Sequence, residues 1–139
     1  MNRRSFLALS TATLATTALA PSLAQASLIY SEGLVQKHLA AGDTVFLGFH
    51  ASWCSTCAVQ EGIIEGLRKD NPAYDSNIVF INVDWDDYRR SDLVKSLGIP
   101  RRSTLVALKG DQDLGRIVAG TAQSQIKSLL DKALNAATA

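Results

Sequence analysis

Several chemically informative residue types are scarce in this chain. Its 139 residues include two cysteines, two histidines, three prolines and one methionine. Acidic and basic residues nearly cancel, and the formal net charge is +1. Without a basic stripe, the sequence gives no electrostatic reason to expect nucleic-acid binding. A structural zinc site needs about four ligands, and the whole supply of Cys and His is Cys54, Cys57, His38 and His50.

The first 26 residues have the organisation of an export signal. Arg3 and Arg4 precede a mostly apolar stretch at 8–20, and the segment closes with Ala24-Gln25-Ala26. This order is typical of a cleavable signal peptide, and the apolar stretch is shorter than the ~20 residues of a membrane span. The arginine pair followed by Ser5-Phe6-Leu7 is typical of bacterial twin-arginine signals. An ordinary secretory signal that happens to carry two arginines is the alternative.

Cleavage after Ala26 predicts a mature domain at 27–139, a size that fits one compact unit. Removing Arg3 and Arg4 changes the formal charge from +1 to −1. Because the first 26 residues are typical of a bacterial export signal, we expect a periplasmic protein. The bacterial periplasm is kept oxidising, so a disulfide between the two cysteines is possible there.

The cysteines, Cys54 and Cys57, lie where a predicted strand ends and a predicted helix begins. Residues 44–50 are apolar and β-rich, and residues 59–67 carry apolar side chains at helical spacing. The free N–H groups and dipole of a helix start favour a thiolate on the first cysteine. A second thiol one turn later can resolve a mixed disulfide. Because a bridge across so short a loop stabilises a fold little, redox chemistry explains the pair better than stability does. Two inert core thiols are the other interpretation.

The hydrophobic pattern predicts an α/β protein. Two strand–helix–strand units, a hairpin and a closing helix indicate parallel central strands with an antiparallel edge. The expected strands are 28–30, 44–50, 78–83, 104–108 and 115–119, and the expected helices are 34–41, 54–69, 88–97 and 122–136.

With the cysteine pair at that junction, the chain resembles the thioredoxin family over nearly all of its mature length. The matching segments are Trp53-Cys54-Ser55-Thr56-Cys57, residues 81–84, residues 97–99, residues 104–110, and Gly120 with the last helix. The resemblance implies a thioredoxin-like three-layer α/β/α sandwich with a mixed central sheet. It also implies a thiol–disulfide oxidoreductase in which Cys54 is the attacking, partly exposed thiol and Cys57 the buried resolving thiol.

Several positions depart from the family pattern, three of them in ways that affect the chemistry of the site. The family's cis-proline directly precedes the strand threonine, and here Ser103 precedes Thr104. Ser103 therefore takes the cis-proline position, or Pro100 takes it in a rearranged loop. A cis peptide before a non-proline residue costs about 2.5–4 kcal/mol, so this peptide can be trans. The family's buried aspartate corresponds to Gly48 and its accompanying lysine to Phe80. Water, Glu61 or a substrate group would then accept the proton of Cys57.

The remaining candidate site residues follow from the same match. We expect Trp53, Ser103 and Thr104 to line a substrate groove. Ser55, Thr56 and His50 are candidates for tuning the thiolate, although His50 can also pack under Trp53 or join the cysteines in a soft-metal site.

Two charged segments near the site have ordinary explanations. Residues 84–87 fit a solvated turn at a helix start better than a metal loop. Arg101 and Arg102 fit a solvated loop better than a contact with an acidic partner.

The expected partners are protein thiols or disulfides and a membrane or periplasmic electron-transfer protein. We predict a monomer with no cofactor and no nucleic-acid ligand. The alternative function is a copper-binding or partner-binding module on the same scaffold.

Overall fold

A computed structural model of the chain describes residues 26–139. The predicted signal segment, apart from Ala26, lies outside the described residues, so the domain boundary stays a prediction. The elements are β1 Leu28–Ile29, α1 Leu34–Ala40, β2 Thr44–His50, α2 Ser55–Asp70, α3 Ala73–Asn77, β3 Ile78–Asp84, α4 Trp85–Tyr88, α5 Asp92–Leu97, β4 Thr104–Lys109, β5 Gln112–Val118 and α6 Gln123–Thr138.

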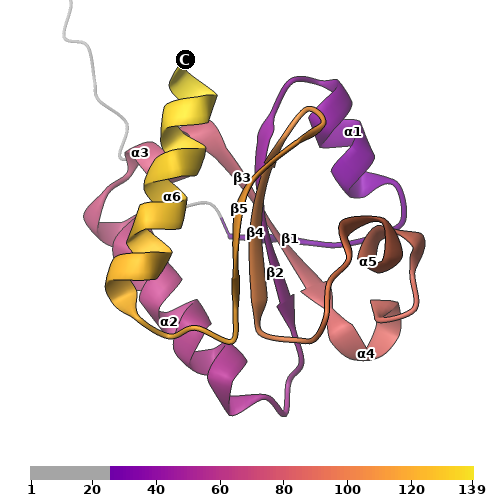
Figure 1. Cartoon of the computed structure of the whole chain (residues 1–139). Coiled ribbons are helices and arrows are strands. Elements are labelled where there is room, and N and C mark those ends of the chain that lie inside the picture. The colour runs from indigo at the N-terminus through magenta and orange to yellow at the C-terminus, as the bar shows by residue number, and fades with distance from the viewer. Residues whose placement is uncertain (1–25) are drawn as a thin grey trace, which may run out of the picture.

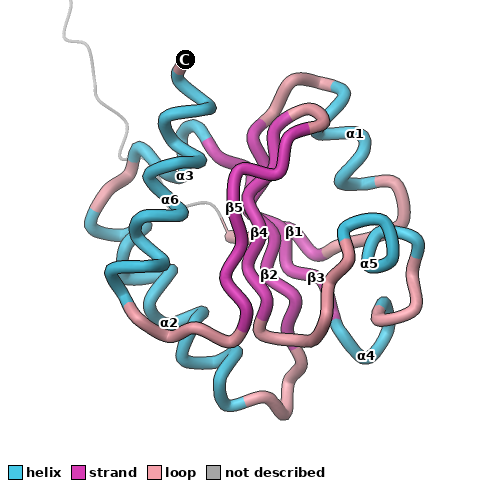
Figure 2. Tube along the Cα trace, viewed as in Figure 1, coloured by secondary structure: helices cyan, strands magenta, loops and turns pink. Residues whose placement is uncertain are grey.

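The five strands form one mixed sheet in the order β1-β3-β2-β4-β5 (Figure 2). Strands β1 and β2 both pair with β3 in parallel, while β4 is antiparallel to β2 and β5 is antiparallel to β4. The predicted parallel centre with an antiparallel edge is therefore confirmed.

Helices cover both faces of this sheet (Figure 1). Helices α2, α3 and α6 lie on one side, and α1, α4 and α5 lie on the other. Strand β2 is buried by both layers because its alternate side chains enter different cores. Val45, Leu47 and Phe49 pack with the α1 and α5 side, whereas Phe46 packs with α2, α3 and α6. This arrangement explains the nearly continuous apolar run that predicted the strand. The predicted three-layer fold is confirmed.

The expected helix at 88–97 is wrong in its start and its continuity. The structure has two short helices, each with its own cap. The Asp84 carboxylate accepts the N–H groups of Asp86 and Asp87 at the start of α4, and the Ser91 hydroxyl accepts the N–H of Val94 at the start of α5. Side chains of this kind stabilise a helix start by binding its free donors.

Two further elements differ from the prediction. Helix α3 was missed, although the end of α2 before Pro72 was predicted; five residues after a proline are too few to show helical periodicity. Strand β5 begins at Gln112, three residues before the expected start. A register shift against β4 at Ala107 and Leu108 interrupts its pattern, and Gly115 there has φ of 149°.

Across residues 26–139, none of the helices combines the length and the apolar character needed to cross a membrane.

A hydrogen bond from the buried Tyr74 links the core to an ion pair on the surface of α6. Lys127 Nζ donates to Asp131 at 2.8 Å, and the buried Tyr74 hydroxyl donates to the same carboxylate. These two hydrogen bonds, that of Lys127 first, hold the pKa of Asp131 below its usual value.

Replacing Asp131 by Asn should therefore lower stability in a pH-dependent way. A depressed folded pKa means that the carboxylate stabilises the fold fully above the unfolded Asp value of about 3.9, and that this contribution is lost as pH falls through the folded pKa. Urea unfolding at neutral and acid pH should show a deficit for Asp131→Asn that shrinks in acid. The exposed turn variant Asp111→Asn is the control. A deficit independent of pH would contradict the assignment.

Candidate active site

The site begins at the junction of β2 and α2. Cys54 is the N-cap residue of α2, with extended backbone at φ −93° and ψ 107°. Its Sγ accepts the N–H of Cys57 at 3.2 Å. A helix start presents unpaired N–H groups, and here one of them is directed at the first sulfur.

Cys54 and Cys57 form a disulfide, with their Cα atoms 5.3 Å apart. They pack with Ala51 and the partly buried Trp85. The expected partial exposure of Cys54 is wrong for this disulfide state: its exposed fraction is 5%, against 2% for Cys57. Both sulfurs are covered because the loop before β4 lies against them.

Ser103 is the residue of that loop that meets the sulfurs. Its Oγ lies 3.1 Å from Cys54 Sγ and 3.1 Å from Cys57 Sγ. Pro100, the alternative occupant, is exposed. Of the two candidates, the residue beside the cysteines is therefore Ser103, and every peptide of residues 26–139 is trans.

The backbone of Ser103 has an unusual conformation. Its φ is +61°, and the Ala119 that bonds to it has φ of +59°. For residues other than glycine this region costs roughly 1–2 kcal/mol. Three hydrogen bonds hold the residue there: its N–H donates to the Phe49 carbonyl at 2.7 Å, and its carbonyl accepts the Ala119 N–H at 2.8 Å and Gln60 Nε2 at 3.0 Å.

Gln60 was missed by the sequence analysis. Its side chain is buried at 2% exposure, and Nε2 donates to the carbonyls of Ser103 and Gly120. It thus ties α2 to two loops that are distant in sequence. Its spacing from Cys57, Ile64 and Leu67 places it on the buried face of α2, a signal available in the sequence.

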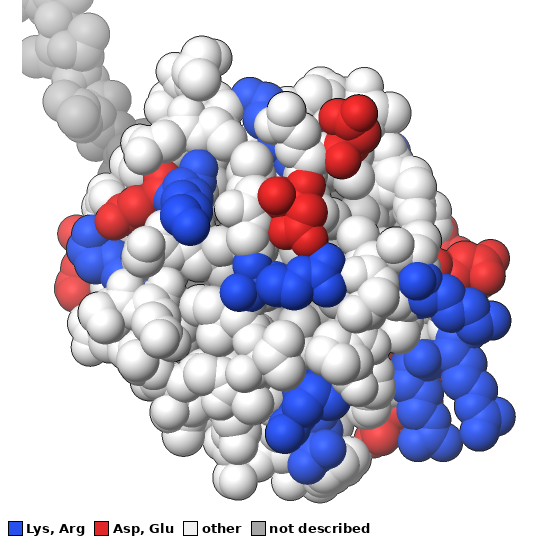
Figure 3. Space-filling model, in the orientation of Figure 1, with Lys and Arg blue, Asp and Glu red and all other residues white. Residues whose placement is uncertain are grey.

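A second missed contact fixes the tryptophan beside the disulfide. Trp53 Nε1 donates to the Asp86 carboxylate at 2.9 Å, and the Arg102 guanidinium lies 4.4 Å from the Trp53 ring centroid. Trp53 nevertheless remains 59% exposed, which suits the wall of a groove. Figure 3 shows basic side chains gathered over the nearby corner between α4 and α5. Arg89 and Arg90 belong to the segment that connects these two helices.

The other predicted groove residues are covered. Ser103 and Thr104 each have 0% exposure, and the Thr104 hydroxyl donates to the Arg101 carbonyl. Their part in a substrate groove stays a prediction. Among the described residues, Ser55 and Thr56 form no hydrogen bond to either sulfur, so their tuning role also stays a prediction.

His50 is directed toward α2. Its Nδ1 lies 3.1 Å from Glu61 Oε1. No group of three His, Cys, Asp or Glu side chains within residues 26–139 is placed to hold a metal ion. The structure thus does not gather the ligand sets considered for zinc or copper.

A small cavity of ~90 Å³ lies where the sequence lacks the family's buried aspartate and lysine. Gly48, Phe80, Asn82 and Glu61 are among its lining residues. The Glu61 carboxylate lies against His50, and no carboxylate of residues 26–139 hydrogen-bonds to the resolving sulfur.

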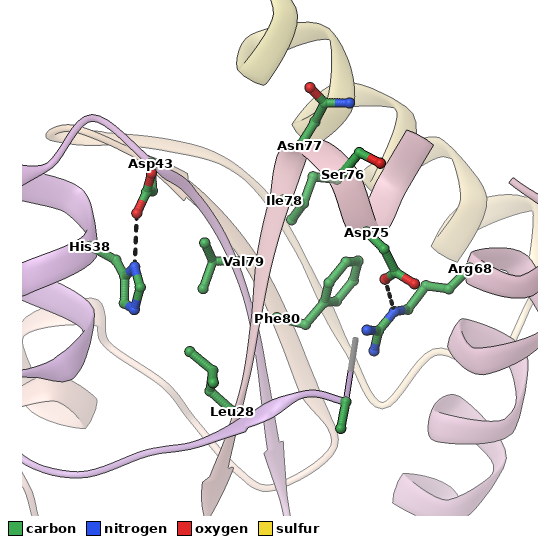
Figure 4. Close-up of a pocket in the computed structure, with 11 residues that line it drawn as sticks. Leu28, His38, Asp43, Arg68, Asp75, Ser76, Asn77, Ile78, Val79 and Phe80 are labelled. Carbon is green, nitrogen blue, oxygen red and sulfur yellow. Dashed lines mark hydrogen bonds and ion pairs between the residues drawn. The ribbon is translucent and has the colours of Figure 1, made fainter. Parts of the chain in front are cut away.

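A larger hollow of ~320 Å³ lies at the other end of β3, beside Ile78 (Figure 4). Its ionisable side chains pair with one another, His38 with Asp43 and Arg68 with Asp75. None of its lining residues belongs to the disulfide site, so this hollow is separate from the cysteines.

A mixed five-stranded sheet between two helical layers, with a Cys-x-x-Cys disulfide at a helix start, defines a thiol–disulfide oxidoreductase. Comparison with known families gives the same class. The thioredoxin family model matches residues 26–132. The chain belongs to the thioredoxin family, whose members act on protein disulfides.

Solved structures show the same fold at low sequence identity. Trxlp from Edwardsiella tarda EIB202 is 24% identical with a TM-score of 0.65, covering 75% of this chain and 98% of that chain. Malassezia sympodialis thioredoxin is 24% identical with a TM-score of 0.63, covering 81% and 95%. Thioredoxin from Trypanosoma brucei brucei is 18% identical with a TM-score of 0.65, covering 84% and 97%.

The position of Gln60 predicts that Gln60→Leu destabilises the protein. The variant keeps the apolar stem but removes two hydrogen bonds to loop carbonyls, a loss of about 2 kcal/mol. Urea unfolding of the oxidised protein measures this, with the exposed Gln36→Leu in α1 as the matched control. Equal stability of the two variants would show that Gln60 does not hold the loops.

Proposed function

We propose that this protein is a periplasmic thiol–disulfide oxidoreductase that acts on protein disulfides, with Cys54 as nucleophile and Cys57 as resolving thiol. The observation that carries the proposal is the Cys57 N–H directed at Cys54 Sγ. A donor at a helix start favours negative charge on that sulfur.

The reaction is a two-electron exchange. The Cys54 thiolate attacks one sulfur of a substrate disulfide, the substrate S–S bond breaks, and one substrate thiolate leaves. The Cys57 thiolate then attacks Cys54 Sγ in the mixed disulfide, and the second substrate thiolate leaves. The substrate is reduced and the Cys54–Cys57 disulfide forms; the reverse sequence oxidises a substrate dithiol.

Single-cysteine variants test these roles. Cys54→Ser should abolish exchange with a protein disulfide such as that of insulin, because it removes the nucleophile. Cys57→Ser should accumulate a mixed disulfide, visible as a mass adduct on Cys54. Normal turnover by Cys54→Ser would refute the assigned nucleophile.

The direction of electron flow depends on the reduction potential of the pair. Thiol labelling of the mature protein in glutathione or dithiothreitol buffers measures it. A value near about −270 mV would make the protein a reductant that needs a membrane or periplasmic electron donor, and one near about −120 mV an oxidant of exported thiols. If the Cys54–Cys57 disulfide does not form in any of these redox buffers, the proposed oxidoreductase function is refuted.

The proposed location rests on the N-terminal sequence. Replacing Arg3 and Arg4 by lysines preserves the charge but removes the twin-arginine pair, and should stop export through that route. Fractionation of a bacterial host should show full-length protein retained in the cytoplasm, whereas the natural sequence gives a periplasmic form beginning at Ser27. Undiminished export of the lysine variant would favour the ordinary secretory route.

A further inference from the structure

Three polar groups of the described residues contact the active-site sulfurs. Ser103 Oγ lies 3.1 Å from both, the Cys57 N–H donates to Cys54 Sγ, and the Phe49 carbonyl oxygen lies 4.0 Å from Cys57 Sγ. None of these groups gains or loses a proton near neutral pH. Negative charge on either sulfur therefore depends on hydrogen bonds from fixed dipoles.

The two sulfurs differ in the number of hydrogen-bond donors around them. Cys54 Sγ has both the Cys57 N–H and the Ser103 hydroxyl as donors. Cys57 Sγ has the same hydroxyl, but its other neighbour is a carbonyl oxygen, which accepts hydrogen bonds and repels a thiolate. With 2% exposure, Cys57 is also shielded from water. The Ser103 hydroxyl is thus the donor that the structure supplies to a Cys57 thiolate.

The hydroxyl is held in this place by the fold. Three hydrogen bonds to its backbone hold Ser103 in its left-handed conformation: its N–H donates to the Phe49 carbonyl, and its carbonyl accepts the Ala119 N–H and the Gln60 side-chain amide. The residue is 0% exposed, and the two sulfurs are the hydrogen-bond partners that its hydroxyl has within residues 26–139. Strained residues that the surrounding structure holds firmly are frequent at functional sites.

From this geometry we infer that Ser103 is a catalytic hydrogen-bond donor shared by the two cysteines. In the dithiol it donates to the Cys54 thiolate. Once Cys54 is in a mixed disulfide, the same hydroxyl donates to the Cys57 thiolate that performs the resolving attack. The hydroxyl keeps its proton throughout, and the electrons move only between sulfurs. This inference rests on the proposed function.

Two variants distinguish the effect of the Ser103 hydroxyl from the effect of its strained backbone. Ser103→Ala removes the hydroxyl and keeps the backbone strain, whereas Ser103→Gly removes the hydroxyl and relieves the strain. If the hydroxyl matters, both variants lose the same activity although their stabilities differ. Ser52→Ala, an exposed hydroxyl before Trp53, is the matched control.

The resolving step is measured by labelling reduced Cys54 with methyl methanethiosulfonate and following loss of the methylthio group by rapid quench and mass spectrometry. At neutral pH both Ser103 variants should resolve roughly tenfold more slowly than the natural protein, because losing a hydrogen bond to a charged group leaves less of Cys57 ionised. At high pH, where Cys57 is fully ionised in every protein, the rates should converge.

The same shift should appear at Cys54. In a Cys57→Ala background, the pH dependence of iodoacetamide alkylation gives the midpoint of Cys54 ionisation. This midpoint should rise in both Ser103→Ala and Ser103→Gly and stay unchanged in Ser52→Ala.

The outcomes distinguish the two levels of the proposal. If the natural protein shows no disulfide exchange, the proposed function itself fails. If the natural protein exchanges and both Ser103 variants remain within twofold at every pH, the hydroxyl is not a catalytic donor. If Ser103→Ala is slow and Ser103→Gly is not, backbone conformation controls the rate and the inference is overturned.

Discussion

The hydrogen bond from the Ser103 N–H to the Phe49 carbonyl is the contact on which the site depends. It joins the loop before β4 to the end of β2, a few residues before the helix start that bears Cys54. Around it, Gln60 and Ala119 bring α2 and the β5–α6 connection to the same residue. Segments separated by dozens of residues therefore close over the disulfide, and the fold creates the buried setting in which its sulfurs react.

Most of the scaffold could be predicted because its signals are local. Strand β2 and helix α2 carry clear periodicities, and the cysteine pair lies at their junction. The prediction placed most of α4 in a turn and began α5 too early, because each helix has at most six residues and caps rather than periodicity define them. Helix α3 was missed for the same reason of length. Local pattern therefore locates long elements well and short capped ones poorly.

The contacts of the site were harder to predict because they join distant residues. The family resemblance offered Ser103 as one of two candidates for the position beside the cysteines, but its left-handed backbone and its equal distances to both sulfurs depend on the whole fold. The bond of Trp53 to Asp86 spans 33 residues and gives no sequence signal. The burial of Cys54 depends on the same loop, so exposure inferred from the cysteine motif alone was wrong.

Both tryptophans of the chain lie at the disulfide: Trp53 precedes Cys54 in sequence, and Trp85 packs against the two cysteines. The chain has no other indole, so its tryptophan fluorescence, excited selectively beyond the absorption of its three tyrosines, originates at the reactive centre. A disulfide quenches a neighbouring indole more strongly than two thiols do. Light emission by the unlabelled molecule thus provides a direct optical record of whether its sulfurs are joined.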